Sequence, residues 1–210
     1  HSMDSDDLEV VARKTTFQGY FRMDEWKVRH RLFEGGWTDE VTRECLERGH
    51  AVAVLPYDPV RDEVVLIEQF RVGAAASAPS PNWDGKPPSP WLTETVAGMV
   101  EDGEHPDEVA ARETMEESGC ALLDLMRITD YLVTPGCSSE TIRLYLGRVD
   151  ASKAGGIHGL DHENEDIRVF TMPAEEAFAL VADGTINNGT IIICLQWLQL
   201  NRDKVRTAWT

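Results

Sequence analysis

The stretch that decides the fold is GMVEDGEHPDEVAARETMEESGC, Gly98 to Cys120. Its second half predicts a helix, because Pro106 suits a first helical turn and Gly119 suits a helix end. Three carboxylates crowd the last two turns of this helix: Glu113, Glu116 and Glu117. A helix C-terminus carries the negative pole of the helix dipole, so each anion there costs roughly 0.3–1 kcal/mol. The sequence therefore places negative charge where a helix disfavours it.

The three glutamates share one face of the helix. Residues at i, i+3 and i+4 fall within roughly a 100° stripe, so their side chains repel one another. Arg112 is the only Lys or Arg between Ala97 and Cys120. A bound divalent cation would relieve the repulsion, and oxygen ligands suit the hard ions Mg²⁺ and Mn²⁺. The alternative from composition alone is an acidic helix face exposed to solvent.

The spacing of the stretch favours the metal site. The fixed residues run Gly98, five residues, Glu104, seven residues, Arg112-Glu113, two residues, Glu116-Glu117, one residue, Gly119. This pattern resembles the Nudix box, G-x5-E-x7-R-E-U-x-E-E-x-G-U, where U is a bulky aliphatic residue. Every fixed position is matched, which makes the signal specific. The two U positions, Thr114 and Cys120, depart from the pattern, but they are packing positions.

The resemblance runs from about Leu8 to the C-terminal helix. Further segments are similar to the bacterial ADP-ribose pyrophosphatase subfamily of Nudix hydrolases: RHRLFEGG, ERGHAVAVLPYDPVRDEVVLIEQFR, ETVAGMVEDGE, TPGCSSE and GGIHGLDHENEDIRV. Two features differ, because Gly73–Pro90 looks longer than in that subfamily and Cys137 stands where a second glycine is usual. The resemblance implies Mg²⁺-dependent hydrolysis of ADP-ribose to AMP and ribose 5-phosphate, with Mn²⁺ as a substitute ion.

The resemblance also implies a role for each residue of the box. The expected metal ligands are the backbone carbonyl of Ala97 and the side chains of Glu113, Glu116, Glu117 and Glu165. Glu116 and Arg112 are expected to be catalytic as well, and Arg112 with Glu104 would orient the glutamates through charge-assisted hydrogen bonds.

A general base is expected in the loop LDHENED, residues 160–166. Such an acidic string is by default a solvated loop. By resemblance Glu163 is the base, which takes a proton from the attacking water, and Glu165 is the extra metal ligand. The sequence leaves open whether the two roles are exchanged. His162 is interpreted as a bystander, although a histidine can also take a proton near neutral pH.

Four residues are candidates for substrate binding. Arg71 resembles an arginine that contacts phosphate, and Glu140 resembles a residue that binds the terminal ribose hydroxyls. Tyr20 and Arg43 match positions that sandwich the adenine, one from each subunit, and a phenol ring and a guanidinium plane can both stack on a purine. The alternatives are a surface charge for Arg71 and an ordinary strand aromatic for Tyr20. The resemblance implies a homodimer with exchanged N-terminal strands.

The remaining segments favour an α+β protein, because strands dominate and helices are interspersed among them. The resemblance implies the Nudix fold, a mixed β-sheet sandwiched between helices and preceded by an N-terminal antiparallel β subdomain. Residues 1–3 are interpreted as an expression remnant, 4–49 as the β subdomain for dimerisation and substrate binding, and 50–210 as the catalytic domain. The expected strands are Leu8–Phe33 with a turn near Met23-Asp24, the hairpin His50–Phe70, Trp91–Gly98, Leu125–Val133, Thr141–Val149 and Ile167–Met172.

Other segments carry weaker signals. Thr38–Gly49 is ambiguous between helix and strand, and Gly73–Pro90, rich in Ala, Ser, Pro and Gly, predicts a long loop without a regular element. Helices are expected at Pro173–Gly184 and from Asn188 onward.

Charge and cysteine usage limit the partners. The chain has 20 Lys+Arg against 37 Asp+Glu and a net charge of −17, which argues against binding nucleic acid or an anionic membrane. The apolar run Thr190–Leu200 is too short and polar to span a bilayer. Four separated cysteines without a CxxC pair indicate reduced thiols in a cytoplasmic protein.

Two alternative functions remain at the level of sequence. A Nudix pyrophosphohydrolase could act on other nucleoside diphosphate sugars, on dinucleotides or on NADH, because the box reports the diphosphate chemistry and not the flanking groups. A non-catalytic nucleotide sensor on the same fold is the alternative from another class. Such a sensor would be expected to lose the box glutamates or the loop base, and this chain keeps them all.

Overall fold

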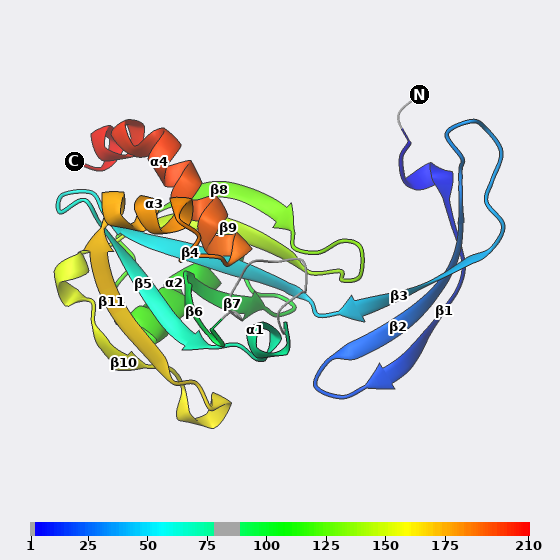
Figure 1. Cartoon of the computed structure of the whole chain (residues 1–210), viewed down its shortest axis with the longest axis horizontal. Coiled ribbons are helices and arrows are strands. Elements are labelled where there is room, and N and C mark those ends of the chain that lie inside the picture. The colour runs from blue at the N-terminus through cyan, green and yellow to red at the C-terminus, as the bar shows by residue number, and fades with distance from the viewer. Residues whose placement is uncertain (1–2, 78–88) are drawn as a thin grey trace. The chain divides into compact units, whose positions relative to one another are not determined.

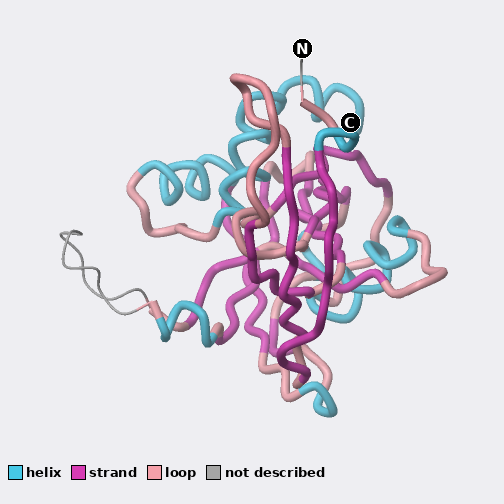
Figure 2. Tube along the Cα trace, turned by 90° about the vertical axis from the view of Figure 1, so that its right-hand side faces the viewer, coloured by secondary structure: helices cyan, strands magenta, loops and turns pink. Residues whose placement is uncertain are grey.

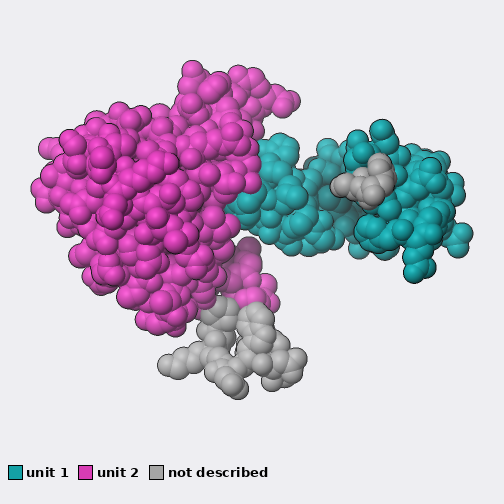
Figure 3. Space-filling view, turned by 90° about the horizontal axis from the view of Figure 1, so that it is seen from above, with its two compact units in different colours: residues 1–50, 131–142 teal, residues 51–130, 143–210 magenta. Residues whose placement is uncertain are grey.

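The computed structural model describes residues 3–77 and 89–210. These residues form two compact units, residues 1–50 with 131–142 and residues 51–130 with 143–210 (Figure 3). Most of the predicted Gly73–Pro90 loop lies outside the described residues.

The first unit is a three-stranded sheet in the order β1-β2-β3. Both strand pairs are antiparallel, as expected for the N-terminal segment (Figure 1). Its elements are a 3-10 turn, Ser5–Asp7, and the strands β1, Leu8–Gln18, β2, Arg22–His30, and β3, Val41–Glu47. Most of the ambiguous segment Thr38–Gly49 is therefore strand, Val41–Glu47.

The turn predicted near Met23-Asp24 is wrong. The hairpin reverses at 19–21, where the Gly19 amide donates to the Phe21 carbonyl. Asp24 lies inside β2 and is buried, with its carboxylate accepting hydrogen bonds from Arg13 and Thr15 of β1. An aspartate next to a methionine reads as a turn signal in sequence, whereas here it is a buried partner of the neighbouring strand.

The second unit is built on an eight-stranded sheet with the order β10-β11-β5-β4-β9-β8, in which β6 pairs with β5 and β7 pairs with β4. Its strands are β4, His50–Asp58, β5, Glu63–Phe70, β6, Trp91–Glu94, β7, Val96–Val100, β8, Asp124–Leu132, β9, Thr141–Arg148, β10, Gly156–His158, and β11, Ile167–Pro173. The expected strand Trp91–Gly98 is thus two strands that pair with different neighbours. The other strand predictions for this unit are confirmed within one to two residues.

Helices accompany this sheet, and the run of helix, strand and loop along the chain can be followed in Figure 2. They are α1, Val72–Ala76, α2, Pro106–Ser118, α3, Ala174–Ala182, and α4, Gly189–Trp209, with 3-10 turns at Ala151–Lys153 and Asp161–Glu163. The three longer helices confirm the sequence predictions. Helix α1 contradicts the expectation of no regular element from Gly73 onward, because its alanines favour one helical turn. No helix within the described residues is both long and apolar enough to cross a bilayer.

The sandwich follows from the alternation of side chains along β5. Val65 and Ile67 belong to the core cluster that contains Val109 and Ala110 of α2. Successive strand residues point to opposite faces, so Val64 and Leu66, which are also fully buried, face away from this cluster. Helix α3 contacts β5 and β11. Both faces of the sheet are therefore covered, as a near-continuous apolar strand predicts.

Helix α2 begins and ends where the sequence predicts. Pro106 occupies the first turn, and the His105 ring accepts a hydrogen bond from the Asp107 amide at 3.3 Å. Gly119 ends the helix with φ +72°, the left-handed region that favours glycine. A Cβ at Gly119 would also lie 2.8 Å from the His158 ring. Both restraints require glycine at this position.

Candidate active site

The carboxylate of Glu117 is the most deeply buried in the glutamate cluster. Its side chain is 4 % exposed, and its Oε2 accepts a hydrogen bond from the Ala97 amide at 3.0 Å. Burial raises the pKa of Glu117 to about 8, helped by the nearby charges of Glu165 and Glu113 and opposed by the Ala97 amide and Arg71. A buried carboxylate among other carboxylates gains stability from a cation.

Glu113 lies against the backbone of β7. A Cβ at Gly98 would collide with the Glu113 carboxyl group, so only glycine allows the helix to approach the strand this closely. Burial raises the pKa of Glu113, the Arg112 guanidinium lowers it, and the charges of Glu116 and Glu165 raise it. The first glycine of the box therefore makes room for one of its glutamates.

Arg112 joins the two ends of the box. Its Nη1 donates to Glu104 Oε1 at 2.5 Å, and its Nη2 donates to Glu113 Oε1 at 3.2 Å. Glu104 also accepts the Glu101 amide at 2.9 Å. The Glu101 amide and then the Arg112 guanidinium lower the pKa of Glu104. These contacts connect Glu104, through Arg112, to Glu113.

The two glutamates of the loop 160–166 differ in their surroundings. Glu165 is half-buried, accepts the Leu160 amide at 3.4 Å, and lies close enough to Glu113 and Glu117 to raise the pKa of both. Glu163 is exposed, and its Oε1 lies 3.6 Å from His162 Nε2. The loop therefore brings Glu165 to the α2 glutamates and leaves Glu163 at the surface.

The carboxylates of the cluster suit a divalent cation by their chemistry. Glu113, Glu116 and Glu117 come from one helix, and Glu165 is added from a separate loop. As these side chains stand, no three His, Cys, Asp or Glu side chains in 3–77 and 89–210 converge enough to hold a metal ion. Glu113 is instead bonded to Arg112 and Glu117 to the Ala97 amide. Closing a cage therefore requires rotation of side chains, and the all-oxygen donor set fits Mg²⁺ or Mn²⁺.

Arg71 follows β5 and faces the same cluster. Burial lowers the pKa of Arg71, but its hydrogen bonds to Glu94 and the negative charges of Glu94, Glu117 and Glu165 raise it overall. Its Nη2 donates to Glu94 Oε2 at 2.8 Å. Sequence reasoning missed Glu94, although a lone carboxylate inside the apolar strand segment WLTETV is a usable signal.

Tyr20 and Glu140 lie in the first unit and are linked through two intermediate residues. Tyr20 is 97 % exposed at the β1–β2 turn, with its ring centroid 5.0 Å from that of Phe21. The Arg48 guanidinium lies 4.8 Å from the centre of the Phe21 ring and donates to Glu140 at 3.1 Å. Tyr20 and Glu140 therefore belong to one end of this unit.

Arg43 lies elsewhere on the same sheet. It pairs with Trp26 in the β2–β3 register, whereas Glu47, four residues further on, pairs with Arg22. Four strand residues span about 13 Å, and Tyr20 lies two residues beyond Arg22. Arg43 lines a cavity of about 350 Å³ together with Trp26, Val28, Glu44, Cys45, Pro135, Gly136 and Cys137. Tyr20 and Arg43 therefore lie at different positions along this sheet.

This fold and this cluster define a hydrolase of the Nudix class. The family model described as "NUDIX domain" matches residues 47–192, and the chain belongs to the Nudix family. Both departures from the box are buried, Thr114 fully and Cys120 at 1 % exposure, as packing positions should be.

Two curated relatives named "ADP-ribose pyrophosphatase" match nearly the whole chain. The protein from Escherichia coli (strain K12) is 46 % identical over 97 % of this chain and 93 % of its own length. The protein from Haemophilus influenzae (strain Rd) is 43 % identical over 97 % and 91 %. A "GDP-mannose pyrophosphatase" from Enterobacter sp. (strain 638) is 32 % identical over 76 % and 78 %.

A solved structure shares the fold. It is titled "Crystal structure of ADP compounds hydrolase", with a TM-score of 0.66, and the match covers 94 % of this chain and 97 % of that chain. Its sequence identity of 19 % supports the fold alone.

Proposed function

We propose that this Nudix hydrolase cleaves the diphosphate bond of ADP-ribose to AMP and ribose 5-phosphate with Mg²⁺, for which Mn²⁺ can substitute. The observation that carries the proposal is the cluster of α2 glutamates joined by Glu165 and faced by Arg71. The names of the relatives that match 97 % of the chain supply the substrate.

The proposed ligands are Ala97, through its backbone carbonyl, Glu113, Glu116, Glu117 and Glu165. When bound, the cations would offset the charge of the diphosphate and ease deprotonation of the attacking water. Arg112 orients Glu113 through the hydrogen bond at 3.2 Å and is held in turn by Glu104. Arg71 adds positive charge on the same side, where it can contact a phosphate oxygen.

Glu163 is proposed as the general base that takes the proton of the attacking water. Its exposed position on the 3-10 turn Asp161–Glu163 supports access to water and to the substrate. Glu165, half-buried and close to Glu117, is better suited to hold a cation than to exchange protons with solvent. His162 is proposed to be a bystander.

The rest of the substrate is proposed to be bound by Tyr20, Arg43 and Glu140, with Tyr20 and Arg43 stacking on the adenine from different subunits. The separation of Tyr20 and Arg43 along the β2–β3 sheet supports two subunits. Strand β1 also supports a homodimer with exchanged N-terminal strands. It is an 11-residue edge strand with no buried residue, and its apolar side chains Leu8, Val10, Val11 and Phe17 are 45–62 % exposed.

We propose a cytoplasmic location, which the four free thiols, Cys45, Cys120, Cys137 and Cys194, support. A net charge of −17 supports the proposal that neither nucleic acid nor an anionic membrane is a partner.

A substrate panel tests the function. Purified protein is assayed with Mg²⁺ against ADP-ribose, nucleoside diphosphate sugars including GDP-mannose, and dinucleotides, and products are identified by chromatography. We expect ADP-ribose to have the highest kcat/KM, no turnover in EDTA, and full recovery with Mg²⁺. Turnover that persists in EDTA would contradict the metal-dependent reaction, and binding without turnover would favour the nucleotide sensor.

The relative that is named GDP-mannose pyrophosphatase makes hydrolysis of another nucleoside diphosphate sugar the second candidate. A higher kcat/KM for GDP-mannose than for ADP-ribose in the same panel would favour this second candidate over ADP-ribose hydrolysis.

The base is tested by Glu163→Gln, with Glu165→Gln beside it. We expect Glu163→Gln to lower kcat by roughly 10²–10⁴-fold while Mg²⁺ and substrate binding persist. Glu165→Gln should weaken Mg²⁺ binding instead. The reverse pattern would exchange the two roles.

A further inference from the structure

Glu94, at the end of β6, is a buried carboxylate with three side-chain partners. It is 6 % exposed. Its Oε1 accepts from Asn188 Nδ2 at 2.9 Å, and its Oε2 accepts from Gln69 Nε2 at 3.1 Å and from Arg71 Nη2 at 2.8 Å. The Arg71 Nε donates to both oxygens, at 3.1 and 3.0 Å. A buried carboxylate is tolerated only when it is satisfied in this way.

The contact fixes one edge of the Arg71 guanidinium, and among the described residues the other edge has no hydrogen-bond partner. The Arg71 side chain is 42 % exposed while that of Glu94 is 9 % exposed, so the pair is anchored from its buried end. Glu94 engages Nε and Nη2, which form one side of the planar fork. The remaining N–H groups point away from Glu94, and Arg71 is close enough to Glu117 and Glu165 to be affected by their charges.

Asn188 connects this pair to helix α4. Its Oδ1 caps the helix by accepting the Thr190 amide at 3.0 Å, while its Nδ2 donates to Glu94. One side chain thus closes the start of a 21-residue helix and holds the carboxylate that holds Arg71. Gln69, the residue before Phe70 on β5, binds the same carboxylate from the strand that leads into Arg71.

We propose that Glu94 is a positioning residue for the hydrolysis. It holds the guanidinium of Arg71 beside the glutamate cluster with its free N–H groups directed to the diphosphate, and Asn188 sets the orientation of Glu94. This inference rests on the proposed function. An unrestrained arginine loses side-chain entropy each time it binds a phosphate, and the Glu94 contact removes that cost before the substrate arrives.

A double-mutant cycle tests the inference. Glu94→Gln, Arg71→Ala and the double variant are compared with wild type with Mg²⁺, on whichever diphosphate of the panel wild type turns over fastest. We expect Glu94→Gln to lower kcat/KM by roughly 10–100-fold, mainly through a higher KM. When Arg71 is already alanine, adding Glu94→Gln should change kcat/KM by less than twofold, because Glu94 acts through Arg71.

The matched control is Asp130→Asn. It removes the carboxylate of another two-bond pair, in which Arg143 Nε and Nη2 donate to Asp130 at 2.8 and 2.9 Å. This pair is exposed and has no proposed role in the reaction, so kcat/KM should stay within twofold of wild type.

Asn188→Ser keeps the inference testable if Glu94→Gln folds poorly. Serine retains an oxygen that can cap α4 but lacks the Nδ2 donor to Glu94. We expect a three- to tenfold higher KM at a nearly unchanged Tm. The inference would be overturned if Glu94→Gln or Asn188→Ser had wild-type kinetics. It would also be overturned if Glu94→Gln lowered kcat/KM by the same factor in the Arg71→Ala variant as in wild type. Failure of wild type on ADP-ribose alone counts against the proposed function, and failure on every diphosphate counts against both.

Discussion

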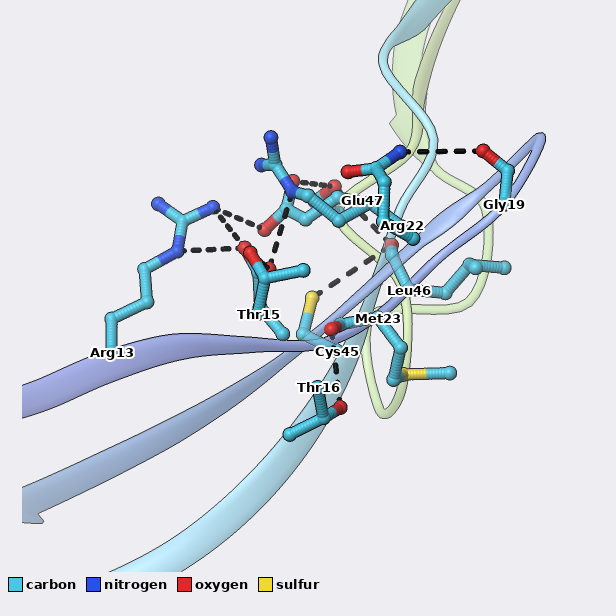
Figure 4. A network of polar contacts seen from close by, with 12 residues as sticks. Arg13, Thr15, Thr16, Gly19, Arg22, Met23, Cys45, Leu46 and Glu47 are labelled. Atoms are coloured by element: carbon cyan, nitrogen blue, oxygen red, sulfur yellow. Dashed lines mark hydrogen bonds and ion pairs between the residues drawn. The ribbon is translucent and has the colours of Figure 1, made fainter.

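The two units differ in the interactions that stabilise each of them internally. In the second unit, the adjacent strands β4 and β5 carry long runs of fully buried apolar side chains. In the first unit, strands β1, β2 and β3 contain a single buried residue, and that residue is the charged Asp24. Figure 4 shows part of the polar network of this sheet, with Arg13 and Thr15 of β1 and Glu47 of β3 labelled. Arg13 and Thr15 both donate hydrogen bonds to Asp24, and Arg13 also donates to Glu47.

The difference shows how the strand register of a three-stranded sheet can be specified without an apolar core. Arg13 Nη2 donates to Asp24 at 2.6 Å and to Glu47 of β3 at 3.0 Å, so one side chain spans all three strands. Thr15 Oγ1 donates to Asp24 at 2.8 Å. Hydrogen bonds of this kind specify which residues pair, whereas apolar burial supplies most of the stability of a domain. Strand β1 has no buried residue. Its proposed contact with a second subunit would supply the apolar burial that the sheet lacks by itself.

The largest effect should come from the glutamate cluster of the second unit. Glu117→Gln removes a proposed ligand, and the loss of several kcal/mol of charge stabilisation corresponds to a fall in kcat of roughly 10²–10³-fold. Glu108→Gln, on the exposed side of the same helix, is the control and should leave kcat unchanged. Steady-state kinetics with saturating Mg²⁺ measure both. Equal effects of the two changes would contradict a ligand role for Glu117.

The next effect concerns the first unit. Asp24→Ala leaves Arg13 and Arg22 without their shared carboxylate, whose pKa the hydrogen bonds from Thr15 and Arg13 lower against the opposing effect of burial. We expect amide hydrogen exchange in β1–β3 to become roughly tenfold faster or more, while exchange in β4 and β5 is unchanged. Uniform destabilisation of both units would refute the idea that this network acts on its own sheet.

A smaller effect is expected from Asp62, which links the β4–β5 turn to α4. Burial alone would raise the pKa of Asp62, but hydrogen bonds from Arg202 and Tyr57 lower it. A carboxylate whose pKa is lowered by folding stabilises the folded state at pH values above its ordinary pKa, which for an aspartate is near 4. This stabilisation is lost as the pH falls below that value toward the lowered pKa of the folded state. Because the group is partly exposed and screened, the contribution is about 1 kcal/mol.

The measurement is the Tm of wild type and Asp62→Asn between pH 7 and pH 3. We expect wild type to be more stable at pH 7 and the difference to shrink below about pH 4. A difference that is constant over the whole range would show that the charge of Asp62 has no part in it.

The smallest effect should come from an exposed ion pair of the first unit. Lys14 Nζ lies 3.0 Å from Glu25, and the lysine side chain is 67 % exposed. Lys14→Gln should change the free energy of unfolding by less than about 0.5 kcal/mol in a denaturant titration. A loss as large as that of Asp24→Ala would mean that surface charge in general, and not the buried carboxylate, holds the sheet together.

The regular elements of the second unit could be predicted from local signals. The apolar strand β5, the limits of α2 at Pro106 and Gly119, and the final helix after Asn188 depend on neighbouring residues in the chain, so their patterns are readable in sequence. Apart from α1 and the division of Trp91–Gly98 into two strands, the errors fall where a polar residue has a distant partner. Asp24 resembles a turn residue in the sequence because its partners, Arg13 and Thr15, are 9 to 11 residues away. The role of Glu94 cannot be predicted from its neighbours because Asn188 lies 94 residues further along the chain.

One feature of the glutamate cluster follows from the sequence alone. The spacing of Glu113, Glu116 and Glu117 within one helix sets their common face, since helix geometry is local. Only the tertiary structure decided what surrounds them: the backbone at Gly98 against Glu113, the half-buried Glu165 near Glu117, and the Glu94 carboxylate that restrains Arg71. These contacts join separate strands, helices and loops, and their energies depend on burial. Burial is a property of the packed chain, and no short stretch of sequence contains it.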